Sequence, residues 1–214
     1  MINTIIFDLD GTLLNTLDDL WASVNYSLAQ NNMPLRNKDE IRSFLGNGAR
    51  QLISLSLPSD QVSKHLSSTL SCFKTYYSQH SLDNTEPYEG IITMLSSLRA
   101  KGYKTGIVSN KPDFAVQQLY KRYFLPYVDI AIGDQSGYNR KPSPDLVYKA
   151  LECLKSQLSE SIYVGDSEVD ILTAQNCGLR CLSVSWGFRD RKYLESNGAT
   201  EIIDHPSLLV EHIN

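Results

Sequence analysis

The stretch from Ile5 to Leu14 constrains the fold of this chain more than any other. It begins with the apolar run Ile5-Ile6-Phe7, which is typical of a strand buried on both faces of a parallel sheet. Asp8 and Asp10 follow directly, and Gly11 can then turn the chain sharply beside a ligand. If the chain stays extended, the two carboxylates share one face at a distance of roughly 6–7 Å. Because like charges this close raise each other's pKa unless a cation lies between them, this strand end is expected to be a functional site.

The composition is that of an ordinary globular protein, with 42% hydrophobic and 21% charged residues. A length of 214 residues suits one core domain with one insertion. The net charge of −4 argues against a nucleic-acid partner. No apolar run approaches the roughly 18 residues that span a bilayer, so no membrane partner is expected. Asn3 and Thr4 lead straight into the first strand, unlike a signal peptide, and four scattered cysteines suit a reducing compartment. We therefore expect a cytoplasmic protein.

Residues 15–83 show helical periodicity and contain no strand-like run. Asn37 can cap one helix, and Gly46-Asn47-Gly48 separates it from a further helix over Ala49–Leu57. A long helical stretch opens at Ser59. The pattern predicts an all-helical insertion directly after the first strand.

From residue 84 the chain alternates between helices and strands, which predicts an α/β fold with a mostly parallel, Rossmann-like sheet. We therefore expect a core domain of residues 1–14 and 84–214 and an inserted helical domain of residues 15–83. Such sheets bind ligands at the C-terminal ends of their strands. Helices are predicted over 90–101, 113–123, 141–154 and 168–177, and strands over 104–108, 128–132, 161–164, 180–184 and 201–203.

Polar residues follow several of these strands. Ser109 and Asn110 offer a hydroxyl, an amide and backbone N–H groups that suit phosphate oxygens, although ordinary turn chemistry would also explain them. Lys141 precedes Pro142 at the predicted start of a helix, where its charge adds to the positive helix end. That position makes sense if both face an anion; a solvated surface lysine is the alternative.

Gly165-Asp166-Ser167 leaves another buried strand, and Asp170 lies one helical turn later. Together with Asp8, these carboxylates would give the all-oxygen, incompletely filled coordination that Mg²⁺ prefers. An N-cap function of Asp166 is the alternative, and both could hold. We expect a Mg²⁺ site built from the carboxylates of Asp8, Asp10, Asp166 and Asp170.

The motif Asp8-Leu9-Asp10-Gly11-Thr12-Leu13 resembles the first motif of the haloacid dehalogenase superfamily of phosphohydrolases. The resemblance implies that Asp8 attacks phosphorus and that Asp10 acts as general acid and base, with Thr12 shaping the turn. It further implies that Asp166 binds the metal directly and that Asp170 orients metal-bound water. The phosphate-binding residues that it implies are Gly11, Ser109, Asn110 and Lys141.

In this superfamily a helical insertion after the first motif is a cap that selects the substrate. Gly46-Asn47-Gly48, Ser-Asn-Lys-Pro at 109–112 and Trp186-Gly187-Phe188 are similar to segments of phosphoglycolate phosphatases. Arg50 could bind a small carboxylate in a bidentate pair, whereas a plain helix-helix turn with a solvated arginine explains the pattern as well. We expect Asn47, Gly48 and Arg50 to contact the substrate.

The sequence therefore predicts a Mg²⁺-dependent phosphomonoester hydrolase that forms an aspartyl-phosphate and acts on a small phosphorylated metabolite, foremost 2-phosphoglycolate. The alternatives are a sugar-phosphate phosphatase of broad specificity, a pyrophosphatase, a phosphomutase, or a non-catalytic binding module of the same fold. A phospho-accepting receiver lacks such an insertion, and a dehalogenase would not need Asp10. Both a monomer and a homodimer are compatible with the sequence.

Overall fold

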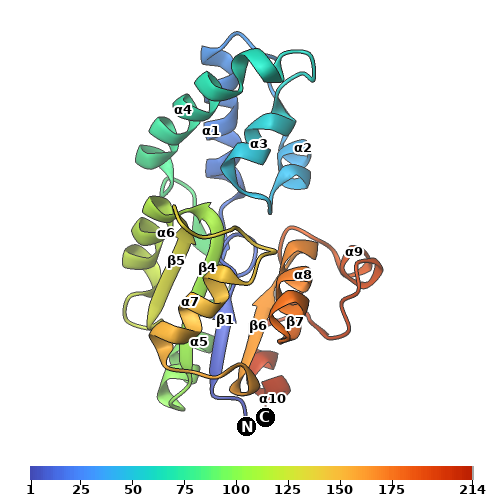
Figure 1. Ribbon diagram of the computed structural model, residues 1–214. Coiled ribbons are helices and arrows are strands. Elements are labelled where there is room, and N and C mark those ends of the chain that lie inside the picture. Colours follow the sequence, from blue (N-terminus) through green and yellow to red (C-terminus); the bar gives the residue numbers. More distant parts are fainter. Residues whose placement is uncertain (214) are drawn as a thin grey trace.

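The computed structural model describes residues 1–213 and confirms the predicted α/β fold. The strands of the main sheet are β1 (Thr4–Phe7), β4 (Lys104–Pro112), β5 (Ile130–Asp134), β6 (Ser161–Gly165), β7 (Arg180–Val184) and β8 (Ile202–Ile203). Across the described residues these six strands are parallel and lie in the order β5-β4-β1-β6-β7-β8. Figure 1 labels β5, β4, β1, β6 and β7 in this order. The strand that leads into the first motif, β1, is therefore in the centre of the sheet.

Alternate residues of β1 face opposite sides of the sheet and belong to two separate cores. Ile5 and Phe7 share a buried cluster with α5 (Ile91–Ala100), α6 (Asp113–Leu119) and α10 (Leu209–Ile213). Ile6 shares the other cluster with α7 (Asp145–Leu154) and α8 (Glu168–Cys177). Helices thus cover both faces of the sheet, which is why β1 carries no alternation of polar and apolar residues.

Between β1 and β4 the chain forms a helical insertion with a core of its own. Its helices are α1 (Leu17–Gln30), α2 (Lys38–Phe44), α3 (Gly48–Ser56) and α4 (Val62–His80), grouped beyond one end of the sheet (Figure 1). Ile41, Ile53 and Phe73 are fully buried among them. As predicted, Asn37 caps α2, in a capping box with Glu40. The all-helical insertion is confirmed, while the domain limits at residues 15 and 83 stay a prediction.

The two ends of the insertion lie side by side. The chain enters through β2 (Leu14–Asn15) and leaves through β3 (Glu86–Pro87), and these short strands pair antiparallel. The buried carboxylate of Asp19 in α1 accepts hydrogen bonds of 2.7–3.1 Å from the backbone and side chains of Asn84 and Thr85. The incoming and outgoing segments are therefore joined at one place.

The predicted helix start at Lys141 was wrong, because α7 begins at Asp145. Lys141 and Ser143 each precede a proline, and the residue before a proline is disfavoured in the helical conformation. The two prolines therefore delay the helix until after Pro144. The argument that placed Lys141 at the positive end of a helix does not hold.

The predicted strand over 128–132 lies two residues later, at Ile130–Asp134. Residues Tyr120–Phe124 continue α6 as a π-helical turn, and the N–H of Val128 still donates to the carbonyl of Phe124. Val128 therefore closes a turn instead of beginning the strand. The short helices α9 (Arg191–Ser196) and α10 were not predicted.

None of the helices formed by residues 1–213 combines the length and the apolar character that crossing a membrane requires.

Candidate active site and metal centre

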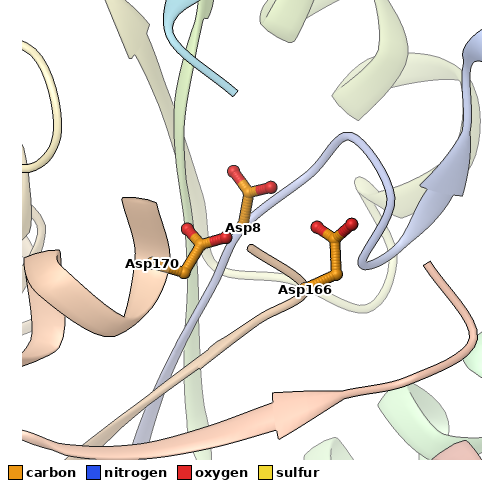
Figure 2. A group of neighbouring side chains, drawn as sticks. All are labelled: Asp8, Asp166 and Asp170. Atoms are coloured by element: carbon orange, nitrogen blue, oxygen red, sulfur yellow. The ribbon is translucent and has the colours of Figure 1, made fainter. Parts of the chain in front are cut away.

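Three buried carboxylates converge at the C-terminal edge of the sheet (Figure 2). Asp8 follows β1, Asp166 follows β6, and Asp170 lies in the first turn of α8. Each offers one oxygen within 4.8 Å of the others. The convergence arises because β1 and β6 are hydrogen-bonded parallel neighbours, so their C-terminal ends meet at one edge.

One lysine is buried among these carboxylates. The Lys141 ammonium donates to Asp8 Oδ1 at 2.6 Å, to Asp170 Oδ1 at 2.8 Å and to the Tyr163 hydroxyl at 2.9 Å, so all three of its N–H donors have partners. Burial opposes the charge of this lysine, but Asp170 and Asp8 outweigh burial and raise the pKa of Lys141 well above its usual value. Lys141 is therefore a fixed positive charge in the site.

The carboxylates nevertheless remain in excess. Burial raises the pKa of Asp8 to about 7, although Lys141 opposes this shift. Burial and the nearby Asp170 raise the pKa of Asp166 well above its usual value. Within the described chain, Lys141 is the one cation that forms ion pairs with this group, so a single positive charge serves three buried carboxylates and the charged forms of Asp8 and Asp166 are disfavoured. Three converging carboxylates with one cation beside them fit a divalent metal ion, which Asp8, Asp166 and Asp170 would hold.

Asp166 is held by two segments that are distant in sequence. Its carboxylate accepts hydrogen bonds from the Thr12 hydroxyl at 3.2 Å and from the Phe188 N–H at 2.8 Å. Gly11 has a φ of +90°, and a Cβ atom there would lie 2.3 Å from Asp166 Oδ2. A Cβ on Gly187 would lie 2.3 Å from the carbonyl oxygen of Gly11. Both glycines are therefore needed for close packing around Asp166, while the shaping of the turn by Thr12 and a phosphate contact of Gly11 stay predictions.

Asp170 is fixed at the start of α8. Ser167 is the N-cap of this helix, so the alternative N-cap function of Asp166 was wrong. The backbone N–H and the hydroxyl of Ser167 donate to Asp170 Oδ2 at 3.2 and 2.6 Å. Since Oδ1 accepts from Lys141, both oxygens of Asp170 are engaged.

Asp10 lies beside the carboxylate cluster and is held by different partners. Its Oδ1 accepts hydrogen bonds from the Thr16 hydroxyl at 2.6 Å and from the Lys111 ammonium at 2.7 Å. Lys111 in turn lies over the ring of Tyr77 from α4, 4.8 Å from its centroid. Within the described part of the chain Asp10 is not a member of the converging metal-binding group, and its predicted metal contact stays a prediction.

Ser109 and Asn110 lie near the end of β4, next to β1. Ser109 is buried and lines a cavity shared with Asp8. The Asn110 side chain donates to the carbonyls of Gly46 at 2.9 Å and Lys141 at 3.0 Å, and it accepts from the Lys141 N–H at 2.9 Å. Asn110 therefore joins the insertion to the backbone that carries Lys141. Its predicted contact with phosphate is untested.

The cavity lies between the carboxylates and the helical insertion. Its walls from the core include the charged or hydroxylic residues Asp8, Asp10, Ser109, Lys111, Lys141, Asp166 and Ser167. Its walls from the insertion are mostly apolar, formed by Leu20, Leu45, Gly46, Gly48, Ala49, Leu52 and Phe73. Asn110, Pro112, Phe188 and Arg189 complete it.

Of the three insertion residues predicted to contact substrate, only Gly48 lines this cavity. Asn47 and Arg50 line a separate open depression together with Arg140. Neighbouring positions of a helix point in different directions, so α3 turns Ala49 toward the cavity and Arg50 away from it. A substrate contact of Asn47 and Arg50 stays a prediction.

Arg189 is a cavity residue that sequence reasoning missed. Its guanidinium donates to the carbonyl oxygens of Arg42 at 2.9 Å, Ser43 at 3.3 Å and Leu45 at 3.0 Å, and it pairs with Glu168 at 3.3 Å. In the sequence it is one arginine in a polar loop after a strand. Three of its partners are main-chain oxygens more than 140 positions away. Because every residue has such a carbonyl group, the sequence does not mark these partners.

Comparison with known proteins agrees with this geometry. The haloacid dehalogenase-like hydrolase family matches residues 5–184. The pyrophosphatase PpaX of Bacillus mycoides (strain KBAB4) is 30% identical over 98% of this chain and 95% of its own length. Phosphoglycolate phosphatase 1 of Pseudomonas aeruginosa is 29% identical over 94% of this chain and 76% of its own length.

A crystal structure from Lactobacillus delbrueckii subsp. bulgaricus, of a predicted phosphoglycolate phosphatase, superposes with a TM-score of 0.93 at 34% identity and covers 99% of this chain and 98% of that one. The similarity thus extends over both the sheet and the insertion. With the family pattern spanning β1 to β7 and the buried carboxylates at the ends of β1 and β6, this chain belongs to the haloacid dehalogenase-like hydrolases and is a phosphatase of that family.

Proposed function

We propose that this protein is a Mg²⁺-dependent hydrolase of small phosphate monoesters that works through an aspartyl-phosphate on Asp8. The observation that carries the proposal is the meeting of Asp8, Ser109 and Lys141 in one cavity, next to two further buried carboxylates. A nucleophile, a hydroxyl and a fixed ammonium around one position are what phosphoryl transfer requires.

In the proposed reaction a carboxylate oxygen of Asp8 attacks phosphorus while the bond to the leaving oxygen breaks. Asp10, in its acid form, gives its proton to that oxygen, and it then takes a proton from the water that hydrolyses the aspartyl-phosphate. Ser109 and Lys141 stabilise the charge on the phosphoryl oxygens. Asp8, Asp166 and Asp170 would hold Mg²⁺, which would supply positive charge that offsets the repulsion of the Asp8 carboxylate and the phosphate.

The contacts of Asp10 support its proposed function as acid and base. Thr16 and Lys111 both donate to Oδ1 and thereby fix the carboxyl plane. The other oxygen, Oδ2, has no hydrogen-bond partner among residues 1–213 and is available to carry the proton that moves. The side chain is partly exposed, at 18%, toward the cavity that it lines. Water can therefore reach Asp10 for the second step.

The proposed substrate is 2-phosphoglycolate, with the helical insertion acting as a cap over the leaving group. The curated relatives support this choice only in part, because one is a phosphoglycolate phosphatase and another is a pyrophosphatase. Phosphoglycolate and pyrophosphate share a short leaving group with a second anionic group. Pyrophosphate is therefore the second candidate, ahead of sugar phosphates of broad variety.

The test is phosphate release from 2-phosphoglycolate, pyrophosphate, hexose phosphates and nucleoside monophosphates, each with Mg²⁺ and with EDTA. We expect activity that depends on Mg²⁺ and prefers phosphoglycolate by about tenfold or more. Equal rates on all esters would support the phosphatase activity but contradict the proposal that 2-phosphoglycolate is the preferred substrate. Interconversion of sugar phosphates without phosphate release would favour a phosphomutase, and no reaction at all would favour a binding module.

A further inference from the structure

Lys111 is a buried cation that the proposed mechanism does not use as a phosphate ligand. It lies in β4, two residues after Ser109, and lines the cavity with Asp8 and Asp10. Its side chain is only 3% exposed, and its ammonium lies 2.7 Å from Asp10 Oδ1. A lysine is rarely buried this deeply unless its charge has a purpose or a full set of partners.

Lys111 does not have a full set of partners. Among residues 1–213 its ammonium has one acceptor at short distance, Asp10, and the Tyr77 hydroxyl lies close by as a weaker second partner, for three N–H donors. Lys141 differs, because Asp8, Asp170 and Tyr163 use all three of its donors. Arg189, the third cation of the cavity, spends four donor contacts on main-chain oxygens and Glu168. Lys111 is thus the cavity cation with the fewest hydrogen-bond partners.

The surroundings of Lys111 on the side of the insertion are apolar or aromatic. Leu20, Leu52 and Phe73 line the cavity from the insertion, and the ring of Tyr77 lies against the ammonium. The Tyr77 hydroxyl is buried and, apart from the Lys111 ammonium close to it, has no hydrogen-bond partner within the described chain. A sugar with several hydroxyls would lose its hydrogen bonds to water against these walls, whereas a single anionic group could pair with Lys111.

We propose that Lys111 is a specificity-determining residue that binds a second anionic group, a carboxylate or a phosphate, on the leaving group. It would thereby select short esters with two anionic groups over sugar phosphates. The proposal rests on the phosphatase function proposed above. It assigns to a lysine of the core the role that the sequence suggested for Arg50, whose side chain lies on the other side of α3.

The test compares two substrates of the same length, 2-phosphoglycolate and ethyl phosphate, which lacks the carboxylate. The measured quantity is the ratio of their kcat/KM values in the wild-type enzyme and in Lys111→Met, Lys111→Arg and Arg50→Met. Lys111→Met also removes a partner of Asp10 and should slow both substrates, an effect that cancels in the ratio. We expect the ratio to fall about tenfold or more in Lys111→Met, the size expected for one lost charged hydrogen bond. Lys111→Arg, which keeps the charge, should retain most of the ratio.

An unchanged ratio in Lys111→Met, or a fall in Arg50→Met instead, would overturn the proposal. If Lys111→Met does not fold, the wild-type enzyme and Lys111→Arg supply the test. A wild-type enzyme that hydrolyses ethyl phosphate as well as 2-phosphoglycolate would overturn the proposal, because it would not recognise the carboxylate. A wild-type enzyme that releases no phosphate from any substrate of the panel described above would instead overturn the phosphatase function itself. The two failures are therefore distinguishable.

Discussion

Arg189, in the loop after β7, donates a hydrogen bond of 3.0 Å to the main-chain oxygen of Leu45 in the helical insertion. The same guanidinium reaches the carbonyls of Arg42 and Ser43, so it binds the C-terminal end of α2. A cation at this end also complements the helix dipole. One side chain of the core thus holds the insertion against the cavity that both parts line.

Replacing Arg189 with Gln should weaken this contact between the core and the insertion. The variant loses several hydrogen bonds from a charged donor, so we expect KM to rise by about tenfold with a smaller effect on kcat. Steady-state kinetics and limited proteolysis of the insertion would measure the change. Arg191→Gln is the matched control, because Arg191 pairs with Glu195 and Asp204 at the surface. Equal kinetics in the two variants would contradict a function of Arg189 in holding the insertion against the cavity.

Replacing the proposed nucleophile, Asp8, with Asn should abolish turnover. Asn keeps the volume and one hydrogen-bond acceptor for Lys141 but cannot form an aspartyl-phosphate, so we expect kcat to fall by at least about a thousandfold. Phosphate release measures the loss, and thermal unfolding shows whether the fold is kept. A well-folded Asp8→Asn enzyme with substantial activity would rule out the proposed covalent step.

Without a divalent cation, the carboxylate cluster should make the protein less stable as pH rises. Burial raises the pKa of Asp8 from 3.8 to about 7, and the pKa of Asp166 is raised as well. Between pH 3.8 and about pH 7 the folded protein binds more protons than the unfolded chain, so the free energy of unfolding falls with increasing pH. Since Mg²⁺ binds the deprotonated carboxylates, the increase in Tm that it causes should grow from pH 5 to pH 7.5.

The measurement is Tm with EDTA and with Mg²⁺ at each pH, so that the contributions of distant groups cancel in the difference. Asp166→Asn removes one carboxylate of the cluster and should reduce the effect of Mg²⁺. A Mg²⁺ effect that is the same at pH 5 and at pH 7.5 would speak against a metal centre at these residues.

Asp19→Asn should destabilise the protein through the junction between the insertion and the sheet. Both oxygens of the buried Asp19 carboxylate accept hydrogen bonds, and the donors are N–H and O–H groups of the backbone and side chains of Asn84 and Thr85. An Asn amide would direct its own N–H groups at these donors, so we expect a loss of about 1–3 kcal/mol in the free energy of unfolding. The neighbouring Asp18 is half exposed and pairs with Lys38 at the surface, so Asp18→Asn should lose less than about 1 kcal/mol. Urea unfolding of both variants would check the contrast.

The parts of the site that residue identity encodes locally could be predicted. An apolar run followed by a carboxylate predicted where Asp8 and Asp166 lie, because parallel neighbours bring their ends together. The capping residue Asn37 was found for the same reason, since a cap acts within one turn.

The contacts between the insertion and the core could not be predicted. Arg189 binds carbonyl oxygens, Asn110 binds the carbonyl of Gly46, and the direction of Arg50 depends on the rotation of α3. Each depends on how two separately folded layers meet, which periodicity within either layer does not describe. Lys111 was likewise seen only as part of a motif until the structure showed how deeply it is buried.

The pairing of β2 with β3 has a consequence for how such a chain can diverge. Because Leu14 and Pro87 are opposite each other in that pair, a short turn could bridge them without moving β1 or β4. The sheet therefore does not depend on which segment is inserted between these positions. The inserted helices can change in length and sequence while the carboxylates at the strand ends stay in place. Relatives about 30% identical that carry different substrate names are what such a modular arrangement permits.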